Sequence, residues 1–469
     1  MFVGRHDELA ALEALYEREG FQMVVLYGRR RVGKTTLLTE FQKGREGIFF
    51  VAQEANDALN LELFSRQVYA FFDMPQTLPP FTSWHDVFSF IASKSRDRRM
   101  LLILDEFSYA AEANRSLLSI LQNVIDHEMK GTHLFLILCG STLTFMEHDV
   151  MGAKSPLYGR RTAQIKVAPF DYFDASLMLD GYCEADCIRF YAVFGGLPHY
   201  LSLIDPGESF DENVGRLVFS KYGYLYEEPM MLLNQELREP ALYNSLLKAI
   251  AGGASKMNEI TTAIGEERTK VTRYLDRLGQ LDVLSRRCPF GEKKEKSRKG
   301  IYRFDDNFYD FWYRYVFPHK ALIERGEGKR VFAELVRADM NAFIGKKFEA
   351  VCFQYMTRLN GLGRLPFWFS EIGSWWGPDR GRKTQEELDL VAQSKDGKKI
   401  IYGECKFKGE KMTGADLEKL QYRARLIGRP DVAYYYLFSR SGFCADLLGR
   451  AAEDDRIVLV PLEGLFQIG

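Results

Sequence analysis

Two glycines, a lysine and two threonines stand close together near the N-terminal end of the chain. Residues 28–36 read Gly-Arg-Arg-Arg-Val-Gly-Lys-Thr-Thr. The glycines permit a tight loop whose backbone N–H groups point at phosphate oxygens, Lys34 can reach the β- and γ-phosphates, and the Thr35 hydroxyl can bind Mg²⁺. A helix that begins near Lys34 adds the positive end of its dipole. The pattern predicts a loop that binds ATP with Mg²⁺ through Gly28, Gly33, Lys34, Thr35 and Thr36.

An acidic pair follows the apolar run at residues 101–104. Asp105, at the end of this expected strand, can hold Mg²⁺ through water. Glu106 is placed to polarise the attacking water as a general base. The simpler alternative is that the two acids only cap a helix. The next expected strand ends in Leu-Cys-Gly-Ser, and the Ser141 hydroxyl could either sense the γ-phosphate or cap a helix.

A further set of candidate catalytic residues lies in the C-terminal part, where residues 387–391 and 400–407 both read as strands. Alternate residues of a strand share a face, so Glu404 and Lys406 project together, and Asp389 can meet them across a hairpin. Two carboxylates on neighbouring strands suit Mg²⁺, which prefers oxygen ligands. The lysine can hold the attacking water or stabilise developing charge. The alternative is an ordinary ion pair between Glu404 and Lys406.

Basic residues gather in the middle of the chain. The helix expected at 269–281 carries Lys270, Arg273 and Arg277, which could lie along a duplex groove. The basic residues of the following loop are Arg286, Arg287, Lys293, Lys294, Lys296, Arg298 and Lys299. A flexible cationic loop suits contact with phosphates that is salt-sensitive and independent of sequence. We expect DNA as the partner; the alternative is a charged hairpin that docks a protein.

The elements that must position these residues are predicted from hydrophobic periodicity. From residue 22 the chain alternates short β-rich runs with helical patterns, and near-continuous apolar runs are typical of strands buried on both faces of a parallel sheet. The expected strands are 23–27, 48–51, 100–104, 133–138 and 164–167. This is the layout of an α/β domain with a parallel sheet of the P-loop nucleotide-binding type.

The remaining chain divides by pattern into further segments. After the ATP-binding core at 1–168, residues 169–240 are mostly helical and are expected to form a lid. Residues 241–304 contain short helices followed by two β-like segments, which is the order of a winged helix. An aromatic-rich connector is expected at 305–345, and α/β character returns at 346–469.

The composition of the chain indicates which partners and which cellular compartment to expect. The net charge of −1 means that any nucleic-acid contact must come from a local basic patch. The seven cysteines are scattered, as in a reducing cytosol. The N-terminus is charged and no apolar run could span a bilayer. We therefore expect a cytoplasmic protein without a membrane partner, and oligomerisation stays open.

Short motifs outside the loop resemble a known ATPase family. Phe-Val-Gly-Arg-x-x-Glu-Leu at 2–9 looks like the adenine-site motif of archaeal-type ATPases in the STAND branch of the AAA-related class. Gly-Leu-Pro at 196–198 resembles their lid motif, and Gly-Arg at 159–160 resembles the pair after their fourth strand. The resemblance implies that Val3 and Arg5 lie near the base and that Pro198 caps the nucleotide.

The same resemblance implies that Arg160 lies near the phosphates or a neighbouring subunit. Arg161 follows directly and could take that part instead. The alternative for Arg160 is a surface ion pair.

The C-terminal residues resemble a nuclease family. Asp389 followed by Glu404-x-Lys406 is similar to the PD-(D/E)XK, or restriction-endonuclease-like, pattern, with Leu388 in place of the usual proline. The resemblance implies an upstream helical acid, Glu349, as a further metal ligand. The region also looks like the uncharacterised domain that follows such ATPases in archaea and anaerobic bacteria.

These observations support competing hypotheses. The leading one is an ATP-controlled, DNA-associated protein whose last domain cleaves nucleic acid with Mg²⁺. The second is a nucleotide-dependent switch that binds DNA or a protein partner, with an inactive nuclease-like domain. A third, a protein-remodelling ATPase, leaves the basic loop without a purpose.

Overall fold

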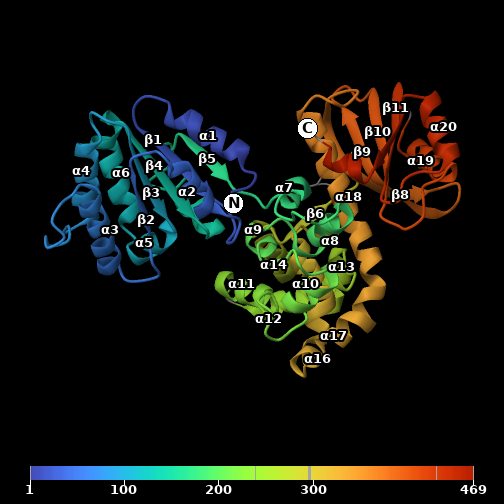
Figure 1. Cartoon of the computed structure of the whole chain (residues 1–469), viewed down its shortest axis with the longest axis horizontal. Helices are drawn as coiled ribbons and strands as arrows, with labels where there is room; N and C mark the ends of the chain where they lie inside the picture. Colours follow the sequence, from blue (N-terminus) through green and yellow to red (C-terminus); the bar gives the residue numbers. More distant parts are fainter. Residues whose placement is uncertain (1, 238, 294–296, 429, 468–469) are drawn as a thin grey trace. The chain divides into compact units, whose positions relative to one another are not determined.

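The chain folds into two compact units. A computed structural model describes residues 2–237, 239–293, 297–428 and 430–467. The first unit comprises Met1–Pro169 with Leu197–His199, and the second comprises Phe170–Gly196 with Tyr200–Gly469 (Figure 1). Each unit is described by itself. Within the described residues, no helix combines the length and apolar character needed to cross a membrane.

The first unit is built on a parallel sheet. Its strands are β1 (Gln22–Tyr27), β2 (Gly47–Val51), β3 (Met100–Asp105), β4 (Leu134–Gly140) and β5 (Ala163–Lys166). They pair in the order β2-β3-β4-β1-β5. Each lies within two residues of its expected position. Because β4 lies between β1 and β3, the segments that leave the carboxyl ends of all three strands share one edge of the sheet.

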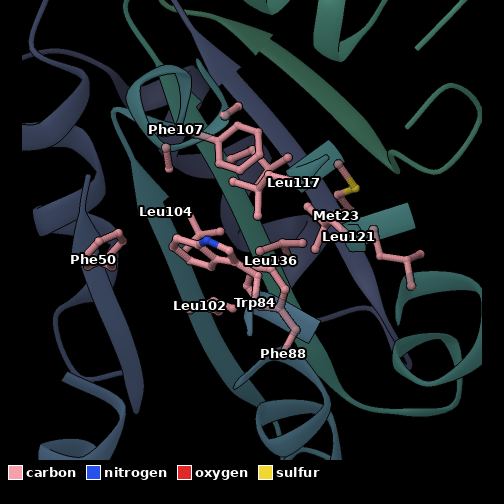
Figure 2. Packing of buried hydrophobic residues seen from close by; sticks show 14 of the residues in the cluster. Met23, Phe50, Trp84, Phe88, Leu102, Leu104, Phe107, Leu117, Leu121 and Leu136 are labelled. Atoms are coloured by element: carbon pink, nitrogen blue, oxygen red, sulfur yellow. The ribbon is translucent and has the colours of Figure 1, made fainter. Parts of the chain in front are cut away.

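Helices cover both faces of this sheet. They are α1 (His6–Tyr16), α2 (Lys34–Gln42), α3 (Asp57–Phe71), α4 (Trp84–Lys94), α5 (Phe107–Ala113) and α6 (Leu117–His127). On one face the rings of Tyr16 and Phe41 pack on Phe135 of β4. On the other, Trp84 and Phe88 of α4 pack over β3 and β4 (Figure 2). The Ser83 side chain accepts a hydrogen bond from the Asp86 amide and caps the start of α4. The apolar residues of α4 are spaced by three and four and face the sheet.

The second unit begins with helices. Residues expected to form a helical lid contain α7 (Tyr172–Ser176), α8 (Glu184–Phe194), α10 (Phe210–Leu217) and α11 (Glu228–Glu236). They also contain the short helix α9 (Pro198–Leu201), whose first two residues belong to the first unit. Next come α12 (Pro240–Ala251), α13 (Met257–Ile264) and α14 (Arg268–Gln280). An antiparallel ribbon of β6 (Leu284–Arg287) and β7 (Ile301–Phe304) follows, so the order of elements agrees with the sequence.

The aromatic segment after the ribbon is helical, and most of its large rings are buried. It comprises α15 (Asn307–Phe311), α16 (Lys320–Glu324), α17 (Gly328–Val331) and the π-helical turns Trp312–Val316 and Phe332–Val336. The Trp312 indole donates to the carbonyl of Tyr226 (2.7 Å), and Phe308 stacks on Phe194. Large rings from this segment therefore fill the space between the preceding helices.

A long helix leads into the last sheet. α18 (Arg337–Gly361) runs without a break across the boundary expected at 345/346. The sheet has the order β12-β11-β10-β9-β8, with antiparallel pairing from β8 to β10 and parallel pairing from β10 to β12. Its elements are β8 (Phe369–Asp379), β9 (Thr384–Ser394), β10 (Lys399–Lys406), α19 (Gly414–Ile427), β11 (Val432–Ser439), α20 (Ala445–Glu453) and β12 (Ile457–Pro461).

Candidate functional site

The glycine-rich loop joins β1 to α2 and closes around Lys34. The ammonium group donates to the carbonyls of Gly28 (2.9 Å) and Arg29 (3.0 Å). Gly33 has φ 89°, and a Cβ on Gly28 would lie 2.3 Å from the Val167 carbonyl oxygen. Both positions therefore need glycine, one for its backbone conformation and one for space. Burial lowers the pKa of Lys34, and the nearby charge of Arg30 acts in the same direction.

Thr35 and Asp105 meet at the start of α2. The Thr35 hydroxyl donates to Asp105 Oδ2 (2.7 Å), and Asp105 Oδ1 accepts the Glu106 amide (2.9 Å). Asp105 is buried at the end of β3, whereas Thr35 and Thr36 are exposed in the first turn of α2. A hydroxyl and a carboxylate in contact are the hard oxygen donors that Mg²⁺ requires. These two residues would suit a magnesium ion, which would supply positive charge beside bound phosphates.

Glu106 and Ser141 also meet at this edge of the sheet. Ser141 directly follows β4, and its hydroxyl donates to Glu106 Oε2 (2.7 Å). This hydrogen bond orients the carboxylate of the candidate base. Glu106 precedes α5 with a left-handed backbone (φ 49°). A non-glycine residue in this conformation costs about 1–3 kcal/mol and persists only where its surroundings hold it. The carboxylate is therefore held in one orientation beside the loop.

The N-terminal segment supports the loop. Arg5 is buried, and its guanidinium donates to the Val32 carbonyl (2.9 Å) and pairs with Glu8 (3.0 Å). Val3 is half-buried in the same segment. Pro198 lies against the loop, since a Cβ on Gly33 would be 3.7 Å from its ring. The resemblance implies that Val3 and Arg5 lie near the base and that Pro198 caps the nucleotide; in the structure Arg5 and Pro198 both contact the phosphate loop.

Arg160 is engaged by Asp126 of α6. Its Nε lies 3.1 Å from each carboxylate oxygen, and its Nη1 donates to the Pro156 carbonyl (2.8 Å). Hydrogen bonds from Arg160 and Lys130 lower the pKa of Asp126 to about 2. Arg161 donates to the Met151 carbonyl (3.2 Å). The ion pair left open for Arg160 is therefore present.

In the second unit, Asp389 and Glu404 lie at the end of the β9–β10 ladder. The last regular pair is Leu390 with Gly403, which sets Asp389 opposite Glu404. Asp389 Oδ2 accepts the Cys405 amide (2.8 Å) in place of a ladder carbonyl. The register between β8 and β9 also shifts here, and such irregularities re-aim side chains. Asp389 and Glu404 therefore lie on neighbouring strands, close enough for the charge of Glu404 to raise the pKa of Asp389.

Burial and mutual repulsion dominate the chemistry of these acids. Burial first, and then the charges of Glu404 and Glu349, raise the pKa of Asp389. Burial also raises the pKa values of Glu349, on α18, and of Glu404. Burial favours the protonated form of each of these acids, and a bound cation would favour the ionised form. Among the described residues, however, no group of three or more His, Cys, Asp or Glu side chains is arranged to hold a metal ion.

A basic side chain from α19 contacts the acidic residues of the sheet. Glu404 pairs with Arg423 (3.1 Å), which also binds Glu386 (2.9 Å). Lys406 pairs with Asp416 rather than with Glu404. Glu404 and Lys406 therefore both reach residues of α19, and each has a different partner there. Sequence reasoning missed Arg423 and Asp416, which lie one helix away in the chain.

The ribbon β6–β7 contacts this part of the second unit. The Phe290 amide donates to the Ser374 carbonyl (2.8 Å), and its ring packs on the core of the last sheet. Arg303 of β7 lies 3.6 Å from Glu387 of β9. Arg287 and Arg303 both act to lower the pKa of Glu349, so the ribbon presents arginines to the acids.

The predicted basic surface is partly neutralised. Lys299 pairs with Glu292 (2.7 Å), Arg287 with Asp305 (3.1 Å) and Lys270 with Glu266 (2.9 Å). Lys294 and Lys296 lie outside the described residues.

One interaction near the loop escaped sequence reasoning. Arg30 Nη2 donates to the Tyr109 hydroxyl (2.8 Å), which joins the glycine-rich loop to α5. The run of arginines at residues 29–31 was the available signal, because charge inside a phosphate loop needs a purpose.

Comparisons with known proteins agree with this geometry. A family described as an ATPase domain predominantly from Archaea matches residues 2–204, and a family of archaeal and bacterial proteins of unknown function matches residues 312–419. An uncharacterised protein of Methanocaldococcus jannaschii is 33% identical over 443 residues, which cover 93% of this chain and 94% of that protein.

One solved structure shares this fold. A Walker-type ATPase of Pyrococcus abyssi, 20% identical, aligns with a TM-score of 0.52 over 67% of this chain and 96% of its own. A STAND-class signal-transduction ATPase of Pyrococcus horikoshii, 18% identical, aligns with a TM-score of 0.30 over 77% of this chain and 51% of its own. With the loop, the acidic pair and the full-length archaeal relative together, the chain belongs to a family of P-loop ATPases whose ATPase domain is found predominantly in Archaea.

Proposed function

We propose that this P-loop ATPase hydrolyses Mg·ATP at the glycine-rich loop and thereby controls a nucleic-acid-cleaving site in its last sheet. The observation that carries the second half is the placement of Asp389 opposite Glu404, with Lys406 two residues further along β10. Two buried carboxylates with raised pKa values would be stabilised by a divalent cation more than by water.

The ATPase half follows from the contacts around the loop. Lys34 would leave the Gly28 and Arg29 carbonyls for the β- and γ-phosphates, while Thr35 and Asp105 hold Mg²⁺. Magnesium, when bound, neutralises phosphate charge as the terminal phosphoryl group leaves. Glu106, oriented by Ser141, would accept a proton from the attacking water.

The nucleic-acid half draws on the helices and ribbon at 240–304, which we propose act as a winged helix. Arg273 is exposed on α14, and Arg303 reaches Glu387 beside the acidic site. The ribbon is also anchored through Phe290. Phosphates of a strand lying on the ribbon would therefore pass close to Asp389 and Glu404. Salt-sensitive binding is expected from this arrangement.

A second candidate function is a nucleotide-dependent switch with an inactive last domain. Its support is that Glu404 and Lys406 are each held by another residue, Arg423 and Asp416. Ion pairs of this kind stabilise a fold without any chemistry. In that case the winged helix would bind DNA or a protein partner under control of the nucleotide.

One experiment separates the two candidates. Cleavage of plasmid and single-stranded DNA is measured with Mg²⁺, with and without ATP, for wild type and for Asp389→Ala, Glu404→Ala and Lys406→Ala. Glu418→Ala is the matched control, since Glu418 lies on the outer surface of α19 in an exposed pair with Arg450. The nuclease proposal predicts cleavage by wild type and by the control only.

Metal binding completes the test. Calorimetric titration of the full chain with Mg²⁺ should lose one site in Asp389→Ala and in Glu404→Ala, and keep it in Lys406→Ala. Absence of cleavage by wild type, together with absence of this binding site, rejects the nuclease and leaves the switch.

A further inference from the structure

Arg30 reaches from the phosphate loop to the helix that follows the acidic pair. Its Nη2 donates to the Tyr109 hydroxyl at 2.8 Å. Tyr109 lies in the first turn of α5, and its backbone amide donates to the Glu106 carbonyl (3.0 Å). The guanidinium therefore lies on the Glu106 side of the loop, where the terminal phosphate and the attacking water would meet.

A second donor of this guanidinium, Nε, is not satisfied by the described part of the protein. Within the residues that the structure describes, the Arg30 Nε is buried and has no hydrogen-bond partner. A buried donor without an acceptor is costly, and guanidinium carries five N–H donors in a fixed plane. Arg30 also stands close enough to Lys34 for its charge to oppose that of the lysine. The carboxylates of Asp105 and Glu106 act on Lys34 in the opposite direction, and an anionic ligand would be attracted by both cations.

Other arginines of the first unit show what a structural arginine looks like. Arg160 spans both oxygens of Asp126, and Arg98 pairs with Glu46 (3.1 Å). For Arg30 the contact at Nη2 is a neutral hydroxyl, which orients the group but leaves its charge uncompensated. A polyphosphate supplies the missing charge and acceptors, and arginine matches its geometry.

We propose that Arg30 binds the γ-phosphate of ATP and stabilises its transfer to water, with Tyr109 as the positioning residue. In the step itself, the water oxygen forms a bond to the γ-phosphorus while the bond to the β,γ-bridging oxygen breaks. The bonding electron pair leaves with ADP, and the water proton passes to Glu106. Arg30 donates hydrogen bonds to the equatorial oxygens throughout. The ATPase thus carries its own arginine in the loop, instead of taking one from a partner.

The inference rests on ATP binding at the loop, and its test compares two nucleotides. Affinities for ADP and for a non-hydrolysable ATP analogue are measured on the full chain with Mg²⁺. Arg30→Gln should lower affinity for the analogue about tenfold or more, as the loss of a charge-assisted hydrogen bond predicts, and leave ADP within about twofold. Turnover should fall about a hundredfold or more.

Control variants keep the result interpretable. Arg98→Gln removes an exposed arginine of the same unit and should change neither affinity nor turnover. Arg30→Lys keeps the charge and should restore part of the analogue affinity but little turnover, which a folding defect would not do. Tyr109→Phe should lower kcat more than it raises KM, because it frees the guanidinium without removing it.

The contrary outcomes are distinct. If Arg30→Gln lowers the affinities for ADP and for the analogue equally, or changes neither affinity, Arg30 does not bind the γ-phosphate and the inference is wrong. If wild type binds neither nucleotide, the ATP site itself fails. A Tyr109→Phe variant with wild-type kcat would remove Tyr109 from the proposal.

Discussion

The phosphate loop of the first unit is basic, whereas the site around Asp389 and Glu404 in the second unit is acidic. The two sites also differ in what already neutralises their charged side chains. At the loop, Lys34 is buried and its ammonium rests on backbone carbonyls that it would surrender to phosphate. At the acidic site, Glu404 is bound by Arg423, so a metal ion would compete with a guanidinium that is already present. The loop therefore presents a buried cation that an anion could bind. At the acidic site, the arginine and the raised pKa values already reduce the negative charge. The difference separates a site formed by local sequence from one whose chemistry depends on its neighbours.

The largest effect is expected at Lys34. Lys34→Ala removes the buried charge that would contact both the β- and γ-phosphates, and loss of two charge-assisted hydrogen bonds corresponds to about a thousandfold in affinity. Nucleotide affinity is measured by calorimetry with Mg²⁺. Lys43→Ala is the control, since Lys43 is exposed at the end of α2 and pairs with Glu40. Unchanged affinity in Lys34→Ala would move the ATP site elsewhere.

Glu106 sharpens the chemistry at the same site. Glu106→Gln should bind ATP like wild type yet lose about 10²–10⁴-fold in kcat, because an amide cannot accept the proton from water. Ser141→Ala should cost less, since it frees the carboxylate without removing it. Steady-state phosphate release gives both values. Wild-type turnover in Glu106→Gln would exclude it as the base.

Arg423 tests whether the acidic site is balanced as described. Arg423→Gln leaves Glu404 and Glu386 without their shared cation, and breaking a buried pair costs about 3–5 kcal/mol. Hydrogen exchange of β10 amides in denaturant reports the local free energy of opening. Arg450→Gln, in an exposed pair with Glu418, should change it by at most about 1 kcal/mol. Equal effects in the two variants would mean that the buried pair is unimportant.

The raised pKa of Asp389 predicts that the stability of the last sheet depends on pH. The folded pKa of this carboxyl is raised, so between the unfolded value of about 3.9 and that raised value the folded unit binds more protons than the unfolded chain. Stability of the last sheet should therefore decrease as pH rises through this window, by at most about 1.4 kcal/mol per pH unit per proton.

Asp389→Asn keeps an oxygen for the Cys405 amide but cannot ionise, so it should flatten the pH profile and stabilise the sheet at neutral pH. The same hydrogen-exchange measurement, repeated across the pH range, checks this. A profile with the wild-type slope would place the titration on another group.

The first sheet shows how far local sequence reaches. Its strands lie within two residues of expectation because a parallel strand buried on both faces is a continuous apolar run. The aromatic segment at 305–345 was predicted as a connector that packs, but its ring content did not indicate which surface the rings would fill. For the same reason the boundary expected at 345/346 falls inside α18, where no break in helical periodicity marks it.

By itself the sequence predicted which residues gather at the phosphate loop. Lys34, Thr35, Asp105 and Glu106 follow from spacing alone, because a loop at the end of one parallel strand and an acid at the end of another must share an edge. Only the tertiary structure decided which partners those residues and their neighbours have. Ser141 holds Glu106 from 35 positions away, and Arg30 meets Tyr109 across 79. Hydrogen bonds and ion pairs of this kind depend on which strands and helices become adjacent, a choice made by the packing of the whole unit.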